Sequence, residues 1–386
     1  MDFKLSKEHE MARKMFREFA ENELEPLAVE IDEEERFPWE SVAKFARYGM
    51  MGIPIPKKYG GAGGDNLMYC IAIEEISKKC ATSSVVVAAH TSLCMGPIMA
   101  FGSEEQKMKY IPDLASGRKI GAFGLTEPGA GTDASGQQTF AVKDGDEYVL
   151  NGVKCFITNG DTADTYVVFA VTDKTKGLKG ISLFIVEKGT PGFTTGLHEK
   201  KMGIRGSSTT DLIFEDCRIP AANLVGKEGQ GWKICMHTLN GARAGVAAQA
   251  LGIGEGALDI TMKYVQERKQ FKKTLSKFQR TQFEIADMHT KLSAGQLLVY
   301  SAACKEDAYN KGDKTQNYAL DSAMAKLFCG EASSDVTRRC VQLFGGYGYI
   351  REYQVERMMR DAKITEIYEG TSEAQRMVIS AQLGIK

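Results

Sequence analysis

The nine cysteines of this 386-residue chain are scattered and include no C-x-x-C pair. That spacing is typical of free thiols and argues against a disulfide framework or a cysteine zinc site. The five histidines form no H-E-x-x-H or related cluster, so no set of metal ligands is visible. Redox or acid–base chemistry in this chain would therefore depend on carboxylates and an organic cofactor.

The chain also lacks an excess of charge, since 49 Lys and Arg balance 50 Asp and Glu to give a net charge of -1. Without a basic field we expect no nucleic-acid partner and no attraction to an anionic membrane. The first residues, MDFKLSKEHEMARKMF, mix acids with bases, which excludes a secretory signal. No uninterrupted apolar stretch has membrane-spanning length. We expect a cytoplasmic protein without a membrane partner.

Length and composition are those of a globular protein with two or three domains. Helical periodicity dominates the first third. The first apolar stripe consists of Met11, Met15, Phe16 and Phe19. The second consists of Met68, Ile71, Ala72 and Ile76. An S-x-x-Q capping box at Ser103 and Gln106 predicts a further helix that ends at Gly117.

The pattern changes near residue 120, where β-rich runs bounded by Gly, Pro, Asp or Asn begin. Within EYVLNGVKCFITNG, the Asn151-Gly152 pair separates two such runs and predicts a hairpin turn. Long helices return after residue 226. One of these expected helices carries a stripe of apolar and small residues suited to a helix bundle, made of Ile285, Met288, Leu292, Gly295 and Val299.

The order α, β, α, with antiparallel strands kept apart from the helices, indicates the α+β class. We expect an N-terminal α-helical domain at 1–120, a middle antiparallel β domain at 121–226 and a C-terminal α-helical bundle at 227–386. Gly252, Gly254 and Ala257 satisfy G-x-G-x-x-A but lie in helical sequence. Close helix packing explains them better than a dinucleotide-binding crossover, which needs a preceding strand.

Several motifs could contact a ligand, although each also has a purely structural interpretation. FGLTEPGAGTD (123–133) and FITNG (156–160) offer hydroxyls and backbone N–H groups, or simply form turns. ERKQFKKTLSKFQ (267–279) concentrates five Lys or Arg, as a solvated helix end or a pyrophosphate clamp. QLFGGYGYI (342–350) either lets a backbone approach closely or breaks a helix.

Near the C-terminus, ITEIYEGTSEAQRMVI places Glu369 before a Gly-Thr-Ser turn. Ser372 and Gln375 have the spacing of a capping box and predict a helix start. Glu369 is either a solvated turn residue or a base. A helix N-terminus stabilises a nearby carboxylate while apolar packing raises its pKa, and a useful base needs these effects balanced.

Together, these stretches resemble the acyl-CoA dehydrogenase family along essentially the full chain. The resemblance is carried by FGLTEPGAGTD, CFITNG, ERKQF, LSKFQRTQFEIADM, QLFGGYGYI and RDAKITEIYEGTSEAQR. Their joint order is specific, and the chain is most similar to the short-chain, butyryl-CoA type. The resemblance implies a C-terminal four-helix bundle, FAD as cofactor and no metal. It also implies a homotetramer, a dimer of dimers with FAD bound across a dimer interface.

The resemblance implies that Glu369 removes a proton α to the thioester of an acyl-CoA. The β-hydride would pass to the flavin N5 and leave a trans-2-enoyl-CoA. The backbone N–H of Glu369, with an FAD ribityl hydroxyl, would polarise the thioester carbonyl. Electrons would be exchanged with an electron-transferring flavoprotein, in this direction or in the reverse reduction.

The resemblance to this family also implies which residues contact the cofactor and the substrate. The residues expected to contact the flavin are Phe123, Leu125, Thr126, Gly131, Thr132, Phe156, Ile157 and Thr158, with Thr371, Ser372 and Glu373 near its far end. Those expected to contact FAD between neighbouring subunits are Arg268, Phe278, Gln279, Gln342, Leu343, Phe344, Gly345 and Gly346. The expected substrate contacts are Thr132, Asn240, Arg243 and Gly370.

Two positions depart from the family pattern. Asn240 replaces the Asp of D-x-x-R, so it can hydrogen-bond to a ligand but carries no charge. Lys272 stands where relatives usually have Gly. Ala242 occupies the position at which the isovaleryl and long-chain branches place their base, which favours Glu369 as the base here.

Other functions remain open at the level of sequence. A branched or cyclic acyl-CoA could be the substrate, whereas a charged tail is disfavoured because 82–93 lacks the Arg of glutaryl-type members. Acyl-CoA oxidases usually carry an added C-terminal domain. A non-catalytic acyl-CoA-binding protein would not need an intact YEGTSE, and a nicotinamide dehydrogenase would need Gly252 to follow a strand.

Overall fold

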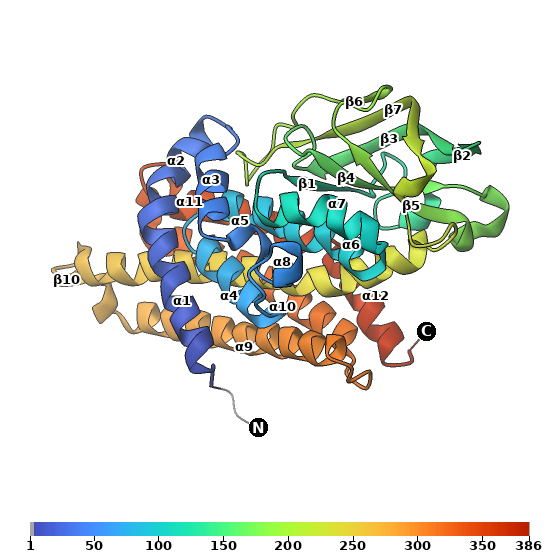
Figure 1. Cartoon of the computed structure of the whole chain (residues 1–386). Coiled ribbons are helices and arrows are strands. Elements are labelled where there is room, and N and C mark those ends of the chain that lie inside the picture. Colours follow the sequence, from blue (N-terminus) through green and yellow to red (C-terminus); the bar gives the residue numbers. More distant parts are fainter. Residues whose placement is uncertain (1–3, 386) are drawn as a thin grey trace.

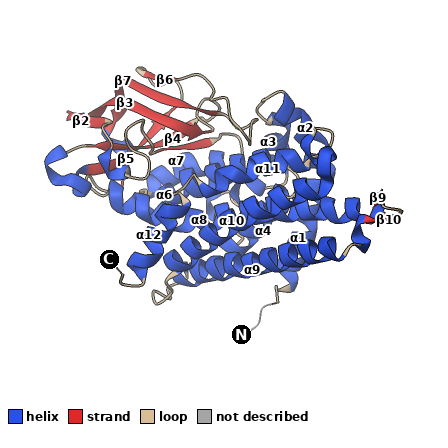
Figure 2. Cartoon of the chain, turned by 180° about the vertical axis from the view of Figure 1, so that it is seen from behind, coloured by secondary structure: helices blue, strands red, loops and turns tan. Residues whose placement is uncertain are grey.

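The chain forms helices, then a sheet, then helices again, which confirms the α+β class (Figure 1). The structure is a computed structural model and describes residues 4–385. The sheet lies along one side of the helical layer, and the long C-terminal helices run beneath it (Figure 2). All nine cysteines are free, as their spacing predicts.

The N-terminal region consists of helices that share one core. They are α1 (Lys7–Phe19), α2 (Glu25–Glu33), α3 (Trp39–Arg47), α4 (Asn66–Ser77), α5 (Ala81–Ala88), α6 (Gly96–Phe101) and α7 (Glu104–Ala115). The capping box of α7 is confirmed. Gln106 N donates to Ser103 Oγ at 3.2 Å, and Ser103 N donates to Gln106 Oε1 at 3.0 Å. The predicted stripe of α4 is buried, with Met68 packed at its edge.

Only half of the stripe predicted for α1 faces the core. Phe16 and Phe19 are buried, but Met11 is 73% and Met15 47% exposed, so that part of the prediction is wrong. Residues four apart lie on the same helix face. The position one turn before Phe16 is taken by Ala12, which packs against the core in place of the methionines.

One helical run is long and apolar enough to span a membrane, contrary to the expectation from the sequence. It covers Ala81–Phe101, that is α5, a π-helical segment (Ala89–Met95) and α6. Its most apolar window is 72% buried inside the protein. The run packs in the core, and buried polar side chains along it are hydrogen-bonded: Thr91 Oγ1, for example, donates to the Met51 carbonyl at 3.1 Å.

The middle region is a mixed sheet of eight strands in the described part of the chain. They are β1 (Gly121–Gly124), β2 (Phe140–Asp144), β3 (Glu147–Thr158), β4 (Thr165–Val171), β5 (Ile181–Glu187), β6 (Phe193–Thr195), β7 (Thr209–Pro220) and β8 (Leu224–Val225). Their order is β6-β7-β3-β2-β4-β5-β8, with β1 on β4. Most pairs are antiparallel as predicted, but β4 runs parallel to β1 and β2.

The hairpin turn predicted at Asn151-Gly152 is wrong. Strand β3 runs through both residues, and the chain reverses instead between Asp144 and Glu147. At Gly152 the register with β7 shifts and φ is +141°. A Cβ there would lie 2.5 Å from Thr139 Oγ1. The glycine therefore serves a bulge and a close approach, not a turn.

The C-terminal region is a bundle of helices. They are α8 (Gly231–Glu267), α9 (Gln279–Asn310), α10 (Tyr318–Phe344), α11 (Val355–Lys363) and α12 (Ser372–Gln382), and a short hairpin of β9 (Lys269–Gln270) and β10 (Lys273–Thr274) joins α8 to α9. The predicted stripe of α9 is buried, except that Ile285 is half-buried. Gly252 lies inside α8, where a Cβ would be 2.2 Å from the Glu74 carbonyl oxygen. Close helix packing is thus confirmed as the reason for this glycine.

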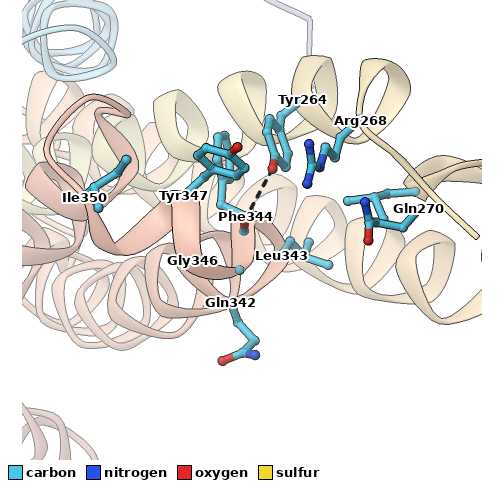
Figure 3. A pocket seen from close by; sticks show the side chains of 11 residues that line it. Tyr264, Arg268, Gln270, Gln342, Leu343, Phe344, Gly346, Tyr347 and Ile350 are labelled. Carbon is cyan, nitrogen blue, oxygen red and sulfur yellow. Dashed lines mark hydrogen bonds between the residues drawn. The ribbon is translucent and has the colours of Figure 1, made fainter.

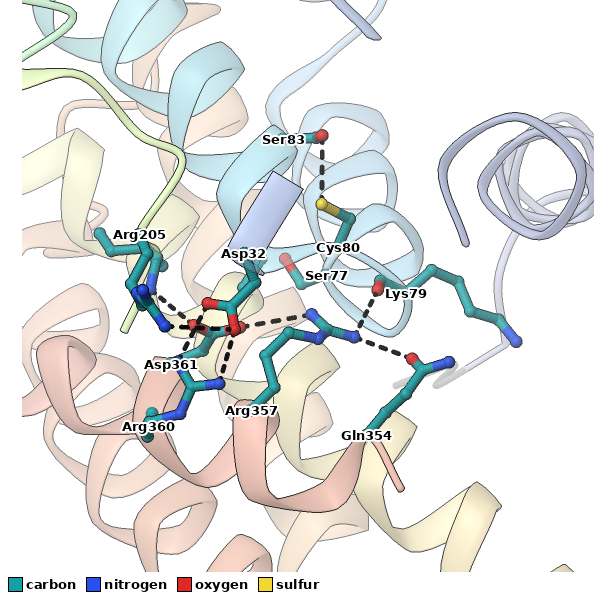
Figure 4. Close-up of polar contacts among 12 residues, drawn as sticks. Asp32, Ser77, Lys79, Cys80, Ser83, Arg205, Gln354, Arg357, Arg360 and Asp361 are labelled. Carbon is teal, nitrogen blue, oxygen red and sulfur yellow. Dashed lines mark hydrogen bonds and ion pairs between the residues drawn. The ribbon is translucent and has the colours of Figure 1, made fainter. Parts of the chain in front are cut away.

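A buried polar network fastens α11 to the other two regions (Figure 4). Arg360 donates to both carboxylate oxygens of Asp32 in α2, at 2.6 and 3.0 Å. Asp361 accepts the backbone N–H of Ile204, from the loop before β7, at 2.6 Å. Because α11 leads directly to Glu369, these contacts fix the position from which that residue extends.

Candidate active site

Glu369 lies at a corner between α11 and α12. A short 3-10 turn (Ile364–Glu366) follows α11, and φ is then +53° at Glu369 and +99° at Gly370. A left-handed backbone is strained for a non-glycine residue and persists only where surrounding contacts hold it. Two side chains hold the Gly370 carbonyl: Lys326 Nζ donates at 2.5 Å and Gln375 Nε2 at 2.8 Å.

The helix that follows starts one residue earlier than the predicted capping box places it. Thr371 is the N-cap, and its Oγ1 accepts from Ala374 N at 3.2 Å. The capping box of Ser372 and Gln375 is therefore wrong, because the Gln375 amide turns back to the corner carbonyl. Ser372 is buried and Glu373 exposed, directly after the corner.

Glu369 is half-buried as a residue, but its Oε2 is buried and has no hydrogen-bond partner among residues 4–385. Burial raises the pKa of Glu369 to about 8, while the nearby cations of Lys326 and Arg243 lower it. A general base works best when its pKa lies near the working pH. An unpaired carboxylate tuned to this range is suited to proton abstraction.

Arg243 contributes the second cation and is 5% exposed. Its Nη1 donates to Asn240 Oδ1 at 2.7 Å, so the neutral Asn240 still orients the guanidinium. Burial lowers the pKa of Arg243, and Glu369 opposes that shift. Arg243 Nε is buried without a partner among the described residues, which leaves one donor for a ligand.

A small apolar cluster joins this corner to the sheet. Ala89, Leu93 and Ala242 form its buried part, with Phe123 of β1 and Leu239 packed against it. Ala242 precedes Arg243 on α8, so the cluster brings Phe123 of β1 to the same stretch of that helix. That Phe123 contacts the flavin stays a prediction.

A buried ion pair lies beneath the 123–133 loop. Lys154 Nζ is 2.8 Å from Glu127 Oε1 and also donates to the Leu125 carbonyl at 3.2 Å. Both side chains are buried, Lys154 completely. The pair fixes the path of the loop and leaves Thr126 half-buried at its surface.

The tip of that loop is open. Gly131 and Thr132 are exposed. A Cβ built on Gly129 or Gly131 meets no heavy atom of the described residues within 4 Å. Backbone N–H groups in such an open stretch are free to face a ligand.

The predicted residues of β3 lie next to the same loop. Cys155 N donates to the Thr126 carbonyl at 2.9 Å. Phe156 has φ +58° and is 63% exposed, whereas Ile157 is buried and Thr158 half-buried. The left-handed backbone turns an aromatic ring outward, which provides an apolar face for a ligand.

The second group of predicted residues lines a cavity of 480 Å³ at the far end of α8 (Figure 3). Its lining consists of Tyr264, Arg268, Gln270, Leu275, Gln342, Leu343, Phe344, Gly345, Gly346, Tyr347 and Ile350. The Tyr264 ring stacks on Phe344 with 3.9 Å between centroids, and the Arg268 guanidinium lies 5.1 Å from the Tyr347 ring centre. The predicted grouping of Arg268 with QLFGG is supported by this geometry.

Two members of the predicted group lie elsewhere. Phe278 and Gln279 do not line the cavity, and they start α9 beyond the hairpin. Lys273 Nζ lies 4.1 Å from the Phe278 ring centre. Sequence reasoning missed Tyr264 and Tyr347, although Tyr264 precedes Arg268 by one helical turn, a spacing that places both on one face.

The two groups are far apart within one chain. Arg243 and Arg268 both lie on or at the end of α8, and 25 residues separate them. At 1.5 Å per residue the separation is about 37 Å. Figure 1 shows the same arrangement, with the β9–β10 hairpin beyond the helices at one end and the sheet toward the other. One chain therefore does not unite them in a single site.

These features fit FAD, a ligand with an aromatic ring system and a pyrophosphate. The exposed Phe156 ring and the open backbone at Gly131 fit the flavin. The Arg268 cavity offers a cation and stacked rings for the phosphate and adenine end. The unpartnered carboxylate of Glu369 is left free for a substrate.

Comparison with known proteins agrees with this site. Acyl-CoA dehydrogenase N-terminal, middle and C-terminal domain models match residues 6–118, 122–217 and 229–384. The chain is 58% identical over 383 residues to the short-chain specific acyl-CoA dehydrogenase of Clostridium acetobutylicum, covering 99% of this chain and 100% of that protein.

Two solved structures are also closely similar. One is butyryl-CoA dehydrogenase from Megasphaera elsdenii, with a TM-score of 0.96, 49% identity, and 99% and 100% of the two chains covered. The other is a chain in the structure of the electron transferring flavoprotein of Acidaminococcus fermentans. It has a TM-score of 0.96, 52% identity, and 99% of each chain covered. From its domains, its site and these matches, the chain belongs to the acyl-CoA dehydrogenase family of FAD-dependent oxidoreductases.

Proposed function

We propose that this enzyme oxidises a short-chain acyl-CoA of the butyryl-CoA type to the trans-2-enoyl-CoA. The observation that carries the proposal is the Glu369 carboxyl, whose Oε2 is buried without a hydrogen-bond partner among the described residues and whose pKa burial raises to about 8. FAD, when bound, accepts the hydride from the β-carbon. The protein supplies the base, the alignment and the exclusion of water.

Glu369 Oε2 takes the proton from the α-carbon of the thioester. Burial makes this carboxylate more basic than an exposed one, so it is a better acceptor for a weakly acidic C–H. We expect the Glu369 backbone N–H to polarise the thioester carbonyl. Asn240, Arg243, Gly370 and Thr132 are the proposed contacts for the rest of the substrate.

The acyl group is short and uncharged. In the apolar cluster beside Arg243, Ala89, Leu93 and Ala242 offer contacts for a hydrocarbon tail. The apolar character of these side chains favours an uncharged tail, because burial of a carboxylate among apolar groups is unfavourable.

An electron-transferring flavoprotein is the proposed electron partner, supported by the structural relative from Acidaminococcus fermentans.

The proposed assembly is a homotetramer, a dimer of dimers. The distance between the Glu369 corner and the Arg268 cavity supports it, because FAD would contact the two groups of residues in different subunits. Light scattering on purified protein measures the mass. We place the enzyme in the cytoplasm, with no nucleic-acid or membrane partner.

The deciding experiment is Glu369→Gln, with Glu10→Gln as the matched control. Glu369→Gln should retain FAD but slow flavin reduction by butyryl-CoA by about a thousandfold, in the range that removal of a general base produces. Glu10 is exposed on α1, and its replacement should change the rate little. Wild-type flavin reduction in Glu369→Gln would refute the proposed base.

Substrate range and direction need separate assays. Anaerobic flavin reduction by propionyl-, butyryl-, hexanoyl-, isobutyryl- and cyclic acyl-CoAs measures tail preference, with the four-carbon linear chain expected to be fastest. Oxygen consumption should stay low, which separates a dehydrogenase from an oxidase. Reduced enzyme mixed with crotonyl-CoA tests the reverse reaction.

A further inference from the structure

Lys326 is a charged residue in the interior of the helical bundle. It lies on α10 with 1% of its surface exposed, between Ala325 and the buried Cys329 one turn further on. Its Nζ donates to the Gly370 carbonyl at 2.5 Å. Burial of an ammonium group is unfavourable unless nearby groups compensate it. The position of Lys326 therefore calls for an explanation.

The carbonyl alone does not require a charged donor. Gln375 Nε2 donates to the same Gly370 oxygen at 2.8 Å and is uncharged and fully buried. A second neutral donor would satisfy the remaining lone pair as well. What Lys326 adds is a positive charge at the carbonyl of Gly370, the residue that follows Glu369.

The groups around this pair come from several elements. Arg243 on α8 is the other cation, and Glu366 and Glu373 act on Lys326 from either side of the corner. Tyr69 on α4 and Tyr368 interact electrostatically with Glu369, and burial holds the pKa of both phenols above 10, so they stay neutral. Near neutral pH, Lys326 and Arg243 are thus the positive charges that act on the Glu369 carboxylate.

We propose that Lys326 is the positioning residue of the catalytic base. Its hydrogen bond holds the left-handed Glu369–Gly370 turn, and its charge favours the ionised form of the Glu369 carboxyl against the effect of burial. The inference rests on the proposed function of Glu369.

The pKa shifts agree with this role. Burial lowers the pKa of Lys326 to about 8, and Glu369 is the largest influence that raises it again. In return, Lys326 lowers the pKa of Glu369 more than Arg243 does. Removal of the ammonium should therefore raise the pKa of Glu369 further and reduce the ionised fraction of the base at neutral pH.

The test is the pH profile of anaerobic flavin reduction by butyryl-CoA in the holoenzyme. The wild-type rate should rise with pH as Glu369 ionises near pH 8. In Lys326→Met this rising part of the pH profile, the acid limb, should move about one pH unit higher. The rate at pH 7 should then be about tenfold lower. The rate should recover at high pH. Lys326→Arg keeps the charge and should keep the limb in place.

Gln375→Leu is the matched control, because it removes a donor to the same carbonyl without removing a charge. It should lower the rate at all pH values and leave the limb unmoved. A profile for Lys326→Met that coincides with wild type, or one for Lys326→Arg that shifts as far as that of Lys326→Met, would overturn the inference. If Lys326→Met does not fold, Lys326→Gln removes the charge, keeps a donor and should show the same shift.

Infrared spectroscopy gives a second readout that needs no turnover. The carboxylic-acid band that disappears in Glu369→Gln belongs to Glu369 and should persist to higher pH in Lys326→Met. The two proposals fail separately. Normal flavin reduction in Glu369→Gln refutes the base, whereas an inactive Glu369→Gln with unshifted Lys326→Met profile and band refutes only the role of Lys326.

Discussion

The two ends of α8 differ in how they hold charge. At the catalytic end, Arg243 and Lys326 are buried and arranged around a single carboxylate, Glu369. At the far end, Arg268 faces an open cavity, and the basic hairpin after it is exposed, with Phe271 88% exposed at its tip. The first set surrounds a carboxylate of the same chain, whereas the second faces a cavity at the surface.

This difference separates two tasks. A base needs a fixed electrostatic environment, which only buried groups supply, because water screens exposed charges. Surface cations and rings are free to contact a molecule that arrives from another subunit. The catalytic end should therefore respond strongly to loss of one charge, and the far end should respond through cofactor binding.

The largest effect is expected for Lys154→Met, beneath the proposed flavin loop. It leaves the Glu127 carboxylate buried without its cation, and breaking a buried pair costs about 3–5 kcal/mol. Urea unfolding of the holoenzyme measures the loss. Lys143→Met, on exposed β2, is the control and should change stability by less than about 0.5 kcal/mol. If both variants lost the same free energy of unfolding, the buried Lys154 would contribute no more to stability than the exposed Lys143, and the contrast drawn here would be wrong.

A smaller effect is expected at the far end, for Arg268→Ala. Loss of a charge-assisted contact should weaken FAD binding about 10- to 100-fold, as measured by titration of the apoprotein. Arg280→Ala is the control, since Arg280 is exposed and does not line the cavity.

Arg268→Ala also tests whether two neighbouring subunits contact the same FAD. Arg268→Ala and Glu369→Gln subunits, each poorly active alone at limiting FAD, should form mixed dimers after co-refolding. About a quarter of all sites would then combine an intact Arg268 with an intact Glu369. Failure of mixed dimers to recover activity would place both residues in the same subunit's site.

The smallest effect is expected for Lys272→Gly in the hairpin. Phe271 and Lys272 both have positive φ, +50° and +64°. Relief of one left-handed side-chain conformation should stabilise the hairpin by about 1 kcal/mol. Thermal melts should show an equal or slightly higher Tm. A clear decrease would mean that the Lys272 side chain makes a contact worth more than the strain.

Much of this protein was determined by local sequence. The Ser103 capping box, the stripe of α9 and the close-packing glycine Gly252 followed from spacing alone, because helix periodicity and capping depend on neighbouring residues. The roles assigned to Glu369 and to the flavin-loop residues rest on ordered motifs and the family resemblance, and they stay predictions. The failures were also local: the Asn151-Gly152 pair predicted a turn, and Met11 and Met15 a buried face.

Only the tertiary structure decided the rest. No local pattern reveals that Lys326 reaches the carbonyl of Gly370, 44 residues away, or that β4 runs parallel to β1. The basicity of Glu369 is likewise set by burial and by cations on α8 and α10. Sequence fixes which groups are present and their local geometry, whereas a pKa depends on distances in space and on the water removed from around the charge.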